Sequence, residues 1–371
     1  MRVVVAEIWR ARGTTSELSG SDKELLKNIA SFNAFYAAGG WHIQDKDVDQ
    51  DLSRIVLVNS SLTNGRILHV SLEFAHVAYT HFTGVEFHQA KFTNAVLQAV
   101  VFTNCKFLLS SFEGARLTDC VFENCETRDL NAKKAIFNQC RFKSFDDTSG
   151  VYDEASFMVC EFEGGRMHNG SFFSTTFQTT SIRNSTLMRC VFSDIKGGDL
   201  AFEEDKVEQC GLGDSTFGAL TVRGGENREV TFKRFNAGPV TIDRCTNAYV
   251  LTVLQSAWEH ARITDCPNLS ELTINDSRMT GFELERNRME YFEMKKTTVS
   301  GRSRIANCVI DGAGLVDSNL IGLAMTNCHV TRYLTLDGAT ADAVVLEGLS
   351  YAPGLRFSAQ GVTYLNGSAR F

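Results

Sequence analysis

The sequence predicts an all-β fold, a solenoid in which short parallel strands stack coil upon coil. The main observation is a five-residue period that starts at Leu52. Of the 23 positions taken every fifth residue from Phe82 to Phe192, 20 hold a large apolar side chain, and only Thr127, Ala132 and Asp147 do not. A period of five fits neither a helix at about 3.6 residues per turn nor a strand at about 2.0. The pattern is therefore a repeat, and the repeat decides the architecture.

A second observation is that the residue two places before each large residue is small, while the others are mostly polar. One large and one small inward side chain per unit suit a chain that turns a corner after each unit. Four units then close a square coil of about 20 residues, and stacked coils pair as parallel strands about 4.8 Å apart. The predicted core includes these residues, which lie in two inward columns: Phe82, Phe102, Phe122, Phe142 and Phe162, with Cys105 and Cys125.

These repeats resemble the pentapeptide-repeat family in its Phe-centred form. The resemblance covers about residues 50–220 and is carried by segments such as Asn94-Ala95, Thr103-Asn104-Cys105-Lys106-Phe107, Glu113-Gly114-Ala115-Arg116-Leu117 and Glu123-Asn124-Cys125. It implies a right-handed quadrilateral parallel β-helix.

Three segments are predicted along the chain: an N-terminal cap over 1–50, a regular β-helix over 51–220, and a degenerate continuation with the C-terminal end over 221–371. In the last segment the strong positions recur about every ten residues, with single-residue slips that predict bulges. Weak positions such as Asn227 and Ala237 favour a flattened coil there.

The two ends of the solenoid need covering, because an open coil exposes apolar side chains and strand edges. A helix over about 22–37, with Leu25, Ile29, Phe32 and Tyr36 on one face, is predicted to cap the first coil. The alternative is a recognition or secretion segment. At the other end Tyr351-Ala352-Pro353-Gly354 breaks the repeat, and the mouth is either closed by this segment or left for a partner.

The eleven cysteines occupy the small inward slot, where we expect reduced thiols that act as compact apolar groups. Several stack one coil apart, as Cys120 does on Cys140. No histidine or CxxC pair joins them, so no metal site is predicted. No phosphate-binding loop or nucleophile motif is present either, and no cofactor is predicted.

The formal net charge of −7 disfavours direct nucleic-acid binding, which needs a basic surface. No apolar stretch approaches the roughly 18 residues of a membrane-spanning helix. The apolar run at Met1–Ala6 is too short for a signal peptide. These features predict a cytoplasmic protein, with delivery as a secreted effector without a cleaved signal peptide as the alternative.

One irregular segment predicts a candidate site. Asp147 falls on an inward position, where a bare carboxylate would be costly. We therefore expect this segment to bulge outward and to present Asp146, Asp147, Asp153 and Glu154 together as an acidic docking patch. The alternative is a solvated kink without a function. A second break at Gly197-Gly198-Asp199, followed by Glu203-Glu204-Asp205, could extend an acidic face.

The predicted function is a non-enzymatic scaffold that presents an extended surface for protein–protein binding, as bacterial pentapeptide-repeat proteins and effectors do. The resemblance also implies an alternative, a DNA mimic that binds DNA gyrase and protects it from quinolones; such members typically form homodimers through their C-terminal ends. Polysaccharide-cleaving enzymes also use β-helices, but their clefts need long loops, and the corners here are too tight for them.

Overall fold

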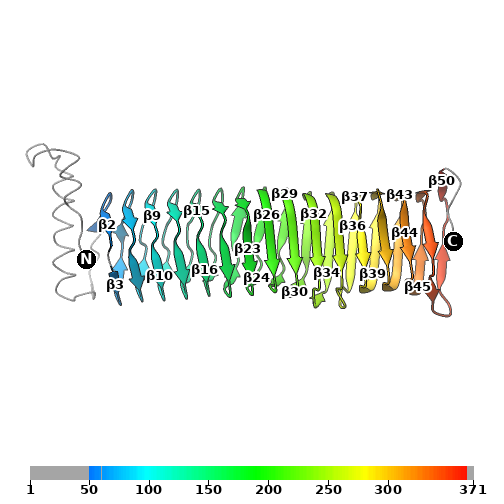
Figure 1. Ribbon diagram of the computed structural model, residues 1–371, viewed down its shortest axis with the longest axis horizontal. Helices are drawn as coiled ribbons and strands as arrows, with labels where there is room; N and C mark the ends of the chain where they lie inside the picture. Colours follow the sequence, from blue (N-terminus) through cyan, green and yellow to red (C-terminus); the bar gives the residue numbers. More distant parts are fainter. Residues whose placement is uncertain (1–49, 60, 366–371) are drawn as a thin grey trace, which may run out of the picture. The chain divides into compact units, whose positions relative to one another are not determined.

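The computed structural model describes residues 50–59 and 61–365, and the predicted helix over 22–37 lies outside these residues. The chain divides into two compact units, one that ends at Thr176 and one that begins at Phe177. In both units the described secondary structure consists of strands, which pair in parallel (Figure 1). Together the units contain about 15 turns. The predicted all-β parallel solenoid is therefore confirmed.

Each coil of the first unit has four sides, which we number in chain order. The strands of the first side are β2 (Val56–Val58), β6 (His76–Ala78), β9 (Val96–Gln98), β12 (Arg116–Thr118), β15 (Ile136–Asn138) and β18 (Ser156–Met158). Those of the second side are β3 (Ser61–Thr63), β7 (His81–Thr83), β10 (Val101–Thr103), β13 (Val121–Glu123), β16 (Arg141–Lys143) and β19 (Glu161–Glu163). Those of the third side are β4 (Arg66–Leu68), β8 (Glu86–His88), β11 (Lys106–Leu108), β14 (Glu126–Arg128), β17 (Asp146–Thr148) and β20 (Arg166–His168). The fourth side consists of β1 (Gln50–Asp51), β5 (Val70–Ser71), single bridges at Lys91, Ser111, Asn131 and Val151, and β21 (Ser171–Phe173).

The register between coils of this unit is 20 residues, so equivalent side chains stack on one another. On the second side Phe102 lies opposite Phe82 and Phe122. The rings are parallel, with centroids 5.1 Å apart for Phe82 and Phe102 and 4.4 Å apart for Phe142 and Phe162. The five phenylalanines predicted for this column are all buried, as are Cys105 and Cys125. Stacked aromatic rings thus fill the coil without leaving room for a ligand.

The corners explain why the period is five. Every fifth residue from Arg54 to Ser174 has a positive φ, and only three of these positions are glycine. A residue in this left-handed conformation turns the chain by nearly a right angle, and asparagine and aspartate tolerate it better than other non-glycine residues. Corners at Asn64, Asn94, Asn104 and Asn124 follow that preference.

The second unit starts with the same sides, but some of its strands run straight through a corner. It contains β23 (Thr180–Arg183), β24 (Thr186–Met188), β25 (Val191–Ser193), β26 (Lys196–Glu203), β27 (Lys206–Glu208), β28 (Gly211–Gly213), β29 (Thr216–Arg223), β30 (Glu226–Arg228), β31 (Val230–Lys233), β32 (Asn236–Asp243), β33 (Asn247–Ala248), β34 (Val250–Leu254), β35 (Ala257–Thr264), β36 (Glu271–Asn275), β37 (Arg278–Thr280), β38 (Glu283–Glu285), β39 (Arg288–Lys295), β40 (Thr298–Ser300), β41 (Ser303–Ala306), β42 (Val309–Val316), β43 (Asn319–Ile321), β44 (Leu323–Thr326), β45 (His329–Thr335), β46 (Thr340–Asp342), β47 (Val345–Glu347), β48 (Ser350–Tyr351), β49 (Arg356–Ser358) and β50 (Thr363–Leu365). The strand β22 (Thr176–Gln178) spans the division between the units.

Straightened corners give this unit a different cross-section. In β26, β29, β32 and β35 the first and second sides merge into one strand of eight residues. From β39 onward the third and fourth sides merge instead. Asp199 and Ala219 have no positive φ, and Pro239 is barred from one by its ring. The strands β26, β29 and β32 thus run through a corner that lacks a left-handed residue, whereas β35 is continuous although His260 keeps a positive φ.

The predicted bulges also occur. The pairing of β32 with β35 shifts register on both sides of Pro239, and that of β42 with β45 shifts between Ile310 and Gly312. The shift between β42 and β45 adds one residue to the later coil. The two shifts around Pro239 cancel, because the partners are 21 residues apart both at Ala237 and at Thr241.

Candidate functional site

The segment around Asp147 does not bulge outward, so this expectation was wrong. Strand β17 pairs in register with β14 and β20, and the side chain of Asp147 is 2% exposed. The hydroxyl of Thr127, one coil away, donates a hydrogen bond to Asp147 Oδ1. Burial raises the pKa of Asp147 to about 6, although hydrogen bonds from Thr127, Tyr152 and the Gly150 backbone oppose the rise. A carboxyl group that can hold a proton is far cheaper to bury than a bare carboxylate.

An exchange of large and small inward residues makes room for this carboxyl group. In the five-residue repeat that contains Asp147, the small slot holds Phe145. Its ring packs edge-to-face against that of Phe142, with 5.2 Å between the ring centroids. Leu130 and Ala132 show the same exchange three repeats earlier, and both are buried. Gly150 completes the site, because a Cβ atom there would lie 2.3 Å from Asp147 Oδ2. The sequence signal was present at two of the three weak positions, because Leu130 precedes Ala132 and Phe145 precedes Asp147 by two residues, whereas Cys125 keeps the small slot before Thr127.

The other three acids of the predicted patch are on the surface, and each is next to a basic side chain. Asp146, on the third side, pairs with Arg166 at 2.7 Å. Asp153 and Glu154, beyond the fourth side, lie 4.0 Å from Lys133 and 3.7 Å from Lys134, respectively. Asp153 also accepts hydrogen bonds from the Ser171 hydroxyl at 2.6 Å and the Phe173 amide at 3.0 Å. The structure therefore spreads the four acids over the core and two different sides, and it offsets the charge of those outside.

A second acid, Asp205, is buried in the other unit. Its Oδ1 accepts a hydrogen bond of 2.7 Å from the Ser185 amide, while Oδ2 has no donor among the described residues. Burial raises the pKa of Asp205 to about 8, and the charges of Glu203 and Glu204 add to this rise. The expected acidic face at 203–205 is thus incomplete, because one of its members points inward as a neutral carboxyl group near pH 7.

Basic and acidic side chains alternate from coil to coil along one edge of the second unit. Glu203 contacts Arg183 at 2.9 Å on one side and Arg223 at 3.8 Å on the other. Arg223 in turn lies 3.8 Å from Asp243. We call these four residues the charge ladder.

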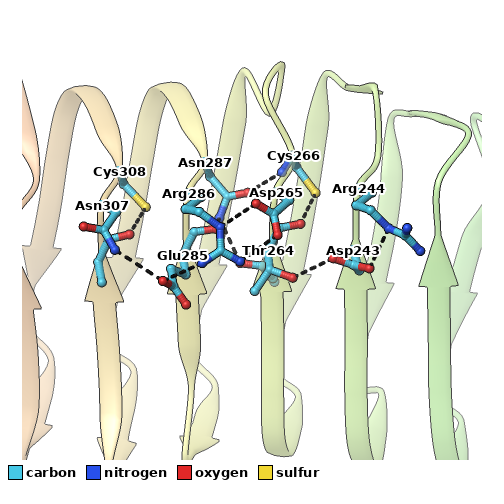
Figure 2. Close-up of polar contacts among 12 residues, drawn as sticks. Asp243, Arg244, Thr264, Asp265, Cys266, Glu285, Arg286, Asn287, Asn307 and Cys308 are labelled. Carbon is cyan, nitrogen blue, oxygen red and sulfur yellow. Dashed lines mark hydrogen bonds and ion pairs between the residues drawn. The ribbon is translucent and has the colours of Figure 1, made fainter.

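The neighbouring corner continues the pattern (Figure 2). There Arg286 makes a two-point contact with Asp265, at 2.6 and 2.8 Å, and also reaches Glu285 at 2.6 Å. The pKa of Arg286 is raised by Asp265, and the pKa of Asp265 is lowered by Arg286. Exposed ion pairs each contribute about 0–1 kcal/mol. Their effect is to neutralise this surface and to favour the correct register of coils.

The last coil of the second unit has an open apolar face, which we call the open end. An opening of about 900 Å³ is lined there by Val330, Leu334, Leu346, Leu349, Leu355 and Phe357, with polar atoms from Glu347 and Ser350. Tyr351 and Phe357 are 66% and 53% exposed. Among the described residues, no strand pairs with β47, β48, β49 or β50 on their outer edges.

The first described coil presents the opposite situation. Its inward residues Leu52, Leu57 and Leu62 are at most 2% exposed, although no described coil precedes them. The described residues therefore include buried inward leucines at the first coil and accessible apolar side chains at the last. The segment Tyr351–Gly354, which interrupts the five-residue repeat, lines the open end and does not close it.

Comparison with known proteins agrees with the repeat pattern. The chain forms a parallel β-solenoid, and residues 71–107 match the family of pentapeptide repeats, with eight copies. The predicted pentapeptide repeats are thereby confirmed. No curated protein matches the chain.

Three solved structures are similar in fold. Full-length QnrB1, a plasmid-mediated fluoroquinolone resistance protein, aligns at 15% identity over 48% of this chain and 93% of its own, with a TM-score of 0.28. HetL, a pentapeptide repeat protein involved in heterocyst differentiation regulation from the cyanobacterium Nostoc sp. strain PCC 7120, aligns at 13% identity over 87% and 94%, with a TM-score of 0.22. The PL6 family alginate lyase AlyGC aligns at 6% identity over 91% and 99%, with a TM-score of 0.24. Likenesses at such scores carry no argument about function.

Within the described part of the chain, no helix is long and apolar enough to cross a membrane. Nor do those residues contain a group of three or more histidine, cysteine, aspartate or glutamate side chains placed to hold a metal ion.

Proposed function

We propose that the protein is a non-catalytic scaffold that binds another protein at the open end. The observation that carries this proposal is the apolar opening in the last coil, with Tyr351 and Phe357 more than half exposed at its rim. Solenoid proteins need polar or capped terminal repeats to stay monomeric. An uncapped apolar coil with open strand edges is instead suited to a partner that buries apolar side chains and pairs with the backbone.

The chemistry of the open end defines the partner. Its walls are leucine, valine and aromatic side chains, so the partner must supply an apolar segment. Free strand edges at β47 and β48 favour a partner segment in extended conformation, which would continue the sheets. A second copy of this chain is one such partner, since its own last coil offers the same edges.

We also propose that residues 1–50 form a cap on the first coil. In this proposal the cap covers the inward side chains Leu52, Leu57 and Leu62, which are buried, and partners bind at the open end. A scaffold with one closed end binds through the other.

The DNA-mimic alternative is less well supported by the geometry. A mimic of duplex DNA needs acids that recur along one face without basic neighbours. In the charge ladder, Glu203 and Asp243 alternate with arginines. Asp146, Asp153 and Glu154 have basic neighbours as well. Binding to DNA gyrase therefore stays a secondary hypothesis.

Catalysis finds little support in the two unusual acids. Asp147 and Asp205 are buried in the core, and neither lines the opening. A general acid or base must reach the proton it transfers. We therefore infer a binding function for this protein.

The test compares three forms of the full chain in quantitative affinity capture from a lysate of the native host. The first is the wild type. The second carries Tyr351→Ser, Phe357→Ser and Leu365→Ser at the open end. The third is a matched control with Phe74→Ser, Leu109→Ser and Val159→Ser, which are equally exposed apolar residues in the first unit. We expect specific partners to be captured by the wild type and the control, and to be lost from the open-end variant.

Equal capture by all three forms would refute the open end as the binding site. Sedimentation of the same three forms shows whether the partner is a second copy, because only the open-end variant would then lose its dimer. A gyrase supercoiling assay with and without a quinolone tests the DNA mimic. Inhibition that disappears as salt rises would favour the mimic over the scaffold.

A further inference from the structure

All eleven cysteines are buried and none forms a disulfide, and each lies one coil from another cysteine. They form five ladders: Cys105–Cys125, Cys120–Cys140–Cys160, Cys190–Cys210, Cys245–Cys266 and Cys308–Cys328. Alanine, serine and threonine fill the same small slot elsewhere, for example Ala90, Ser110 and Thr175. If packing alone placed cysteine in these slots, some cysteines would stand without a cysteine neighbour, and none does.

The Cys308–Cys328 ladder is the one nearest to the open end. Cys328 accepts a backbone hydrogen bond of 2.9 Å from Ser350, which lines the opening at the open end. Val330, two residues beyond Cys328, lines it as well. The backbones of the two cysteines are joined by a hydrogen bond of 2.8 Å from His329 to the carbonyl of Cys308. The two cysteines therefore occupy equivalent corners of neighbouring coils, Cys308 between β41 and β42 and Cys328 between β44 and β45, close to the opening.

The separation of the strands suits a two-coordinate metal ion better than a disulfide. A disulfide needs two sulfur atoms about 2.05 Å apart and Cβ atoms that converge. Neighbouring parallel strands are about 4.8 Å apart, and their side chains project in parallel. A thiolate–metal bond is roughly 2.3 Å long, so a linear S–metal–S bridge spans about 4.6 Å. That length matches one step between coils without backbone movement.

We propose that the Cys308–Cys328 ladder binds one soft monovalent metal ion of the Cu⁺ or Ag⁺ class, with the two sulfur atoms as its ligands. Thiolates are the ligands that such soft ions prefer. On binding, two S–H bonds break, two S–metal bonds form and two protons pass to solvent, which leaves one negative charge on the site.

This site differs in kind from a zinc site. Structural zinc requires four ligands in a tetrahedron, and the described residues offer no such group. The ladder supplies two ligands in line, with apolar surroundings that exclude water. We therefore expect Ag⁺ to bind and Zn²⁺ not to compete with it.

The test counts bound ions by native mass spectrometry of the reduced full chain titrated with Ag⁺. The variants are Cys308→Ser, Cys328→Ser and the double variant, with Ser318→Ala as a control in an equivalent slot without a thiol. A bridging site loses one ion in each single variant and still only one ion in the double variant. The control should bind as many ions as the wild type.

Two results would overturn the proposal. Loss of two ions in the double variant would mean that each thiol binds an ion on its own. An unchanged count in all variants would mean that this ladder binds none. Circular dichroism is recorded before and after addition of Ag⁺, and a count obtained with loss of the β-sheet spectrum counts against the site. Cys308→Ala and Cys328→Ala repeat the experiment if a serine variant fails to fold, because alanine is a natural occupant of this slot.

Discussion

At the residue scale, the two buried carboxyl groups couple folding to protonation. Burial raises the pKa of Asp147 to about 6 and that of Asp205 to about 8, from an ordinary value of 3.8. At a pH between the ordinary and the raised pKa, each carboxyl group keeps its proton in the folded chain but has released it in the unfolded chain. The stabilising contribution is therefore complete below about pH 4 and is lost as the pH rises through the folded pKa values.

Replacing Asp205 with asparagine should remove most of this dependence in the second unit. The amide oxygen can still accept the hydrogen bond from Ser185, and no charge has to be buried at high pH. We expect Asp205→Asn to increase the free energy of unfolding at about pH 9 by on the order of 3 kcal/mol, and to change it little at about pH 4. Thermal unfolding at a series of pH values measures this. Asp214→Asn is the control, because Asp214 is exposed and its pKa is lowered by Arg234. A wild-type stability that does not fall between these pH values would contradict the prediction.

Gly150 is predicted to be intolerant of any side chain. A Cβ atom there would lie 2.3 and 2.7 Å from the carboxyl oxygens of Asp147 and 2.7 Å from the Tyr152 ring. Gly150→Ala should therefore cost about 1–3 kcal/mol, as other overpacked cores do. Gly211→Ala should be neutral, because nothing lies within 4 Å of its Cβ position. Denaturant unfolding compares the two, and equal stabilities would show that the core around Asp147 adapts freely.

The sequence predicted which residues face inward but not how Asp147 is accommodated. The expectation of an outward bulge assumed a charged carboxylate. The structure instead combines a raised pKa, a hydrogen bond from Thr127 and the missing side chain of Gly150. That arrangement joins residues from neighbouring coils. The five-residue pattern indicated their positions but not their protonation.

At the element scale, the ring stacks of the first unit carry much of its stability. Phe102 is fully buried and contacts the rings of Phe82 and Phe122 in the stack. Phe102→Ala should lower the free energy of unfolding by about 3–5 kcal/mol, through lost burial and the cavity left behind. Phe74→Ala, at a residue that is 55% exposed, should change it by less than about 0.5 kcal/mol. A similar small effect for both variants in denaturant unfolding would mean that the coil collapses around the missing ring.

The strand lengths of the second unit could not have been predicted from the repeat. A corner exists where one residue takes a positive φ, and ordinary residues such as Arg244 do so here as readily as glycine. Gly198 and Gly218 are glycines that could turn the chain, yet both lie inside straight strands. Gly238 is needed there for another reason, since a Cβ atom would lie 2.4 Å from the carbonyl oxygen of Gly218. The presence of a glycine alone therefore does not predict which corners are kept.

At the scale of the whole molecule, the accessible last coil predicts which strands of the second unit are least protected from hydrogen exchange. Strands β47 and β50 have a paired neighbour on one side, whereas β41 and β44 are paired on both. Backbone amides of β50 should therefore exchange with solvent at least 100-fold faster than those of β41, because they open without disturbing other coils. Hydrogen exchange with mass spectrometry measures this, and the bound partner should slow exchange at the open end. Uniform protection along the second unit would argue against an uncovered last coil.

The alternating charges of the charge ladder also limit how the length of this protein can change over evolutionary time. Arg183, Glu203, Arg223 and Asp243 follow one another at intervals of one coil. Loss of a single coil after Arg183 would place it beside Arg223, so that like charges meet, while loss of two coils would place it beside Asp243. Duplications obey the same rule. Gains and losses of coils in this stretch should therefore be favoured in even numbers, because only these keep opposite charges next to one another.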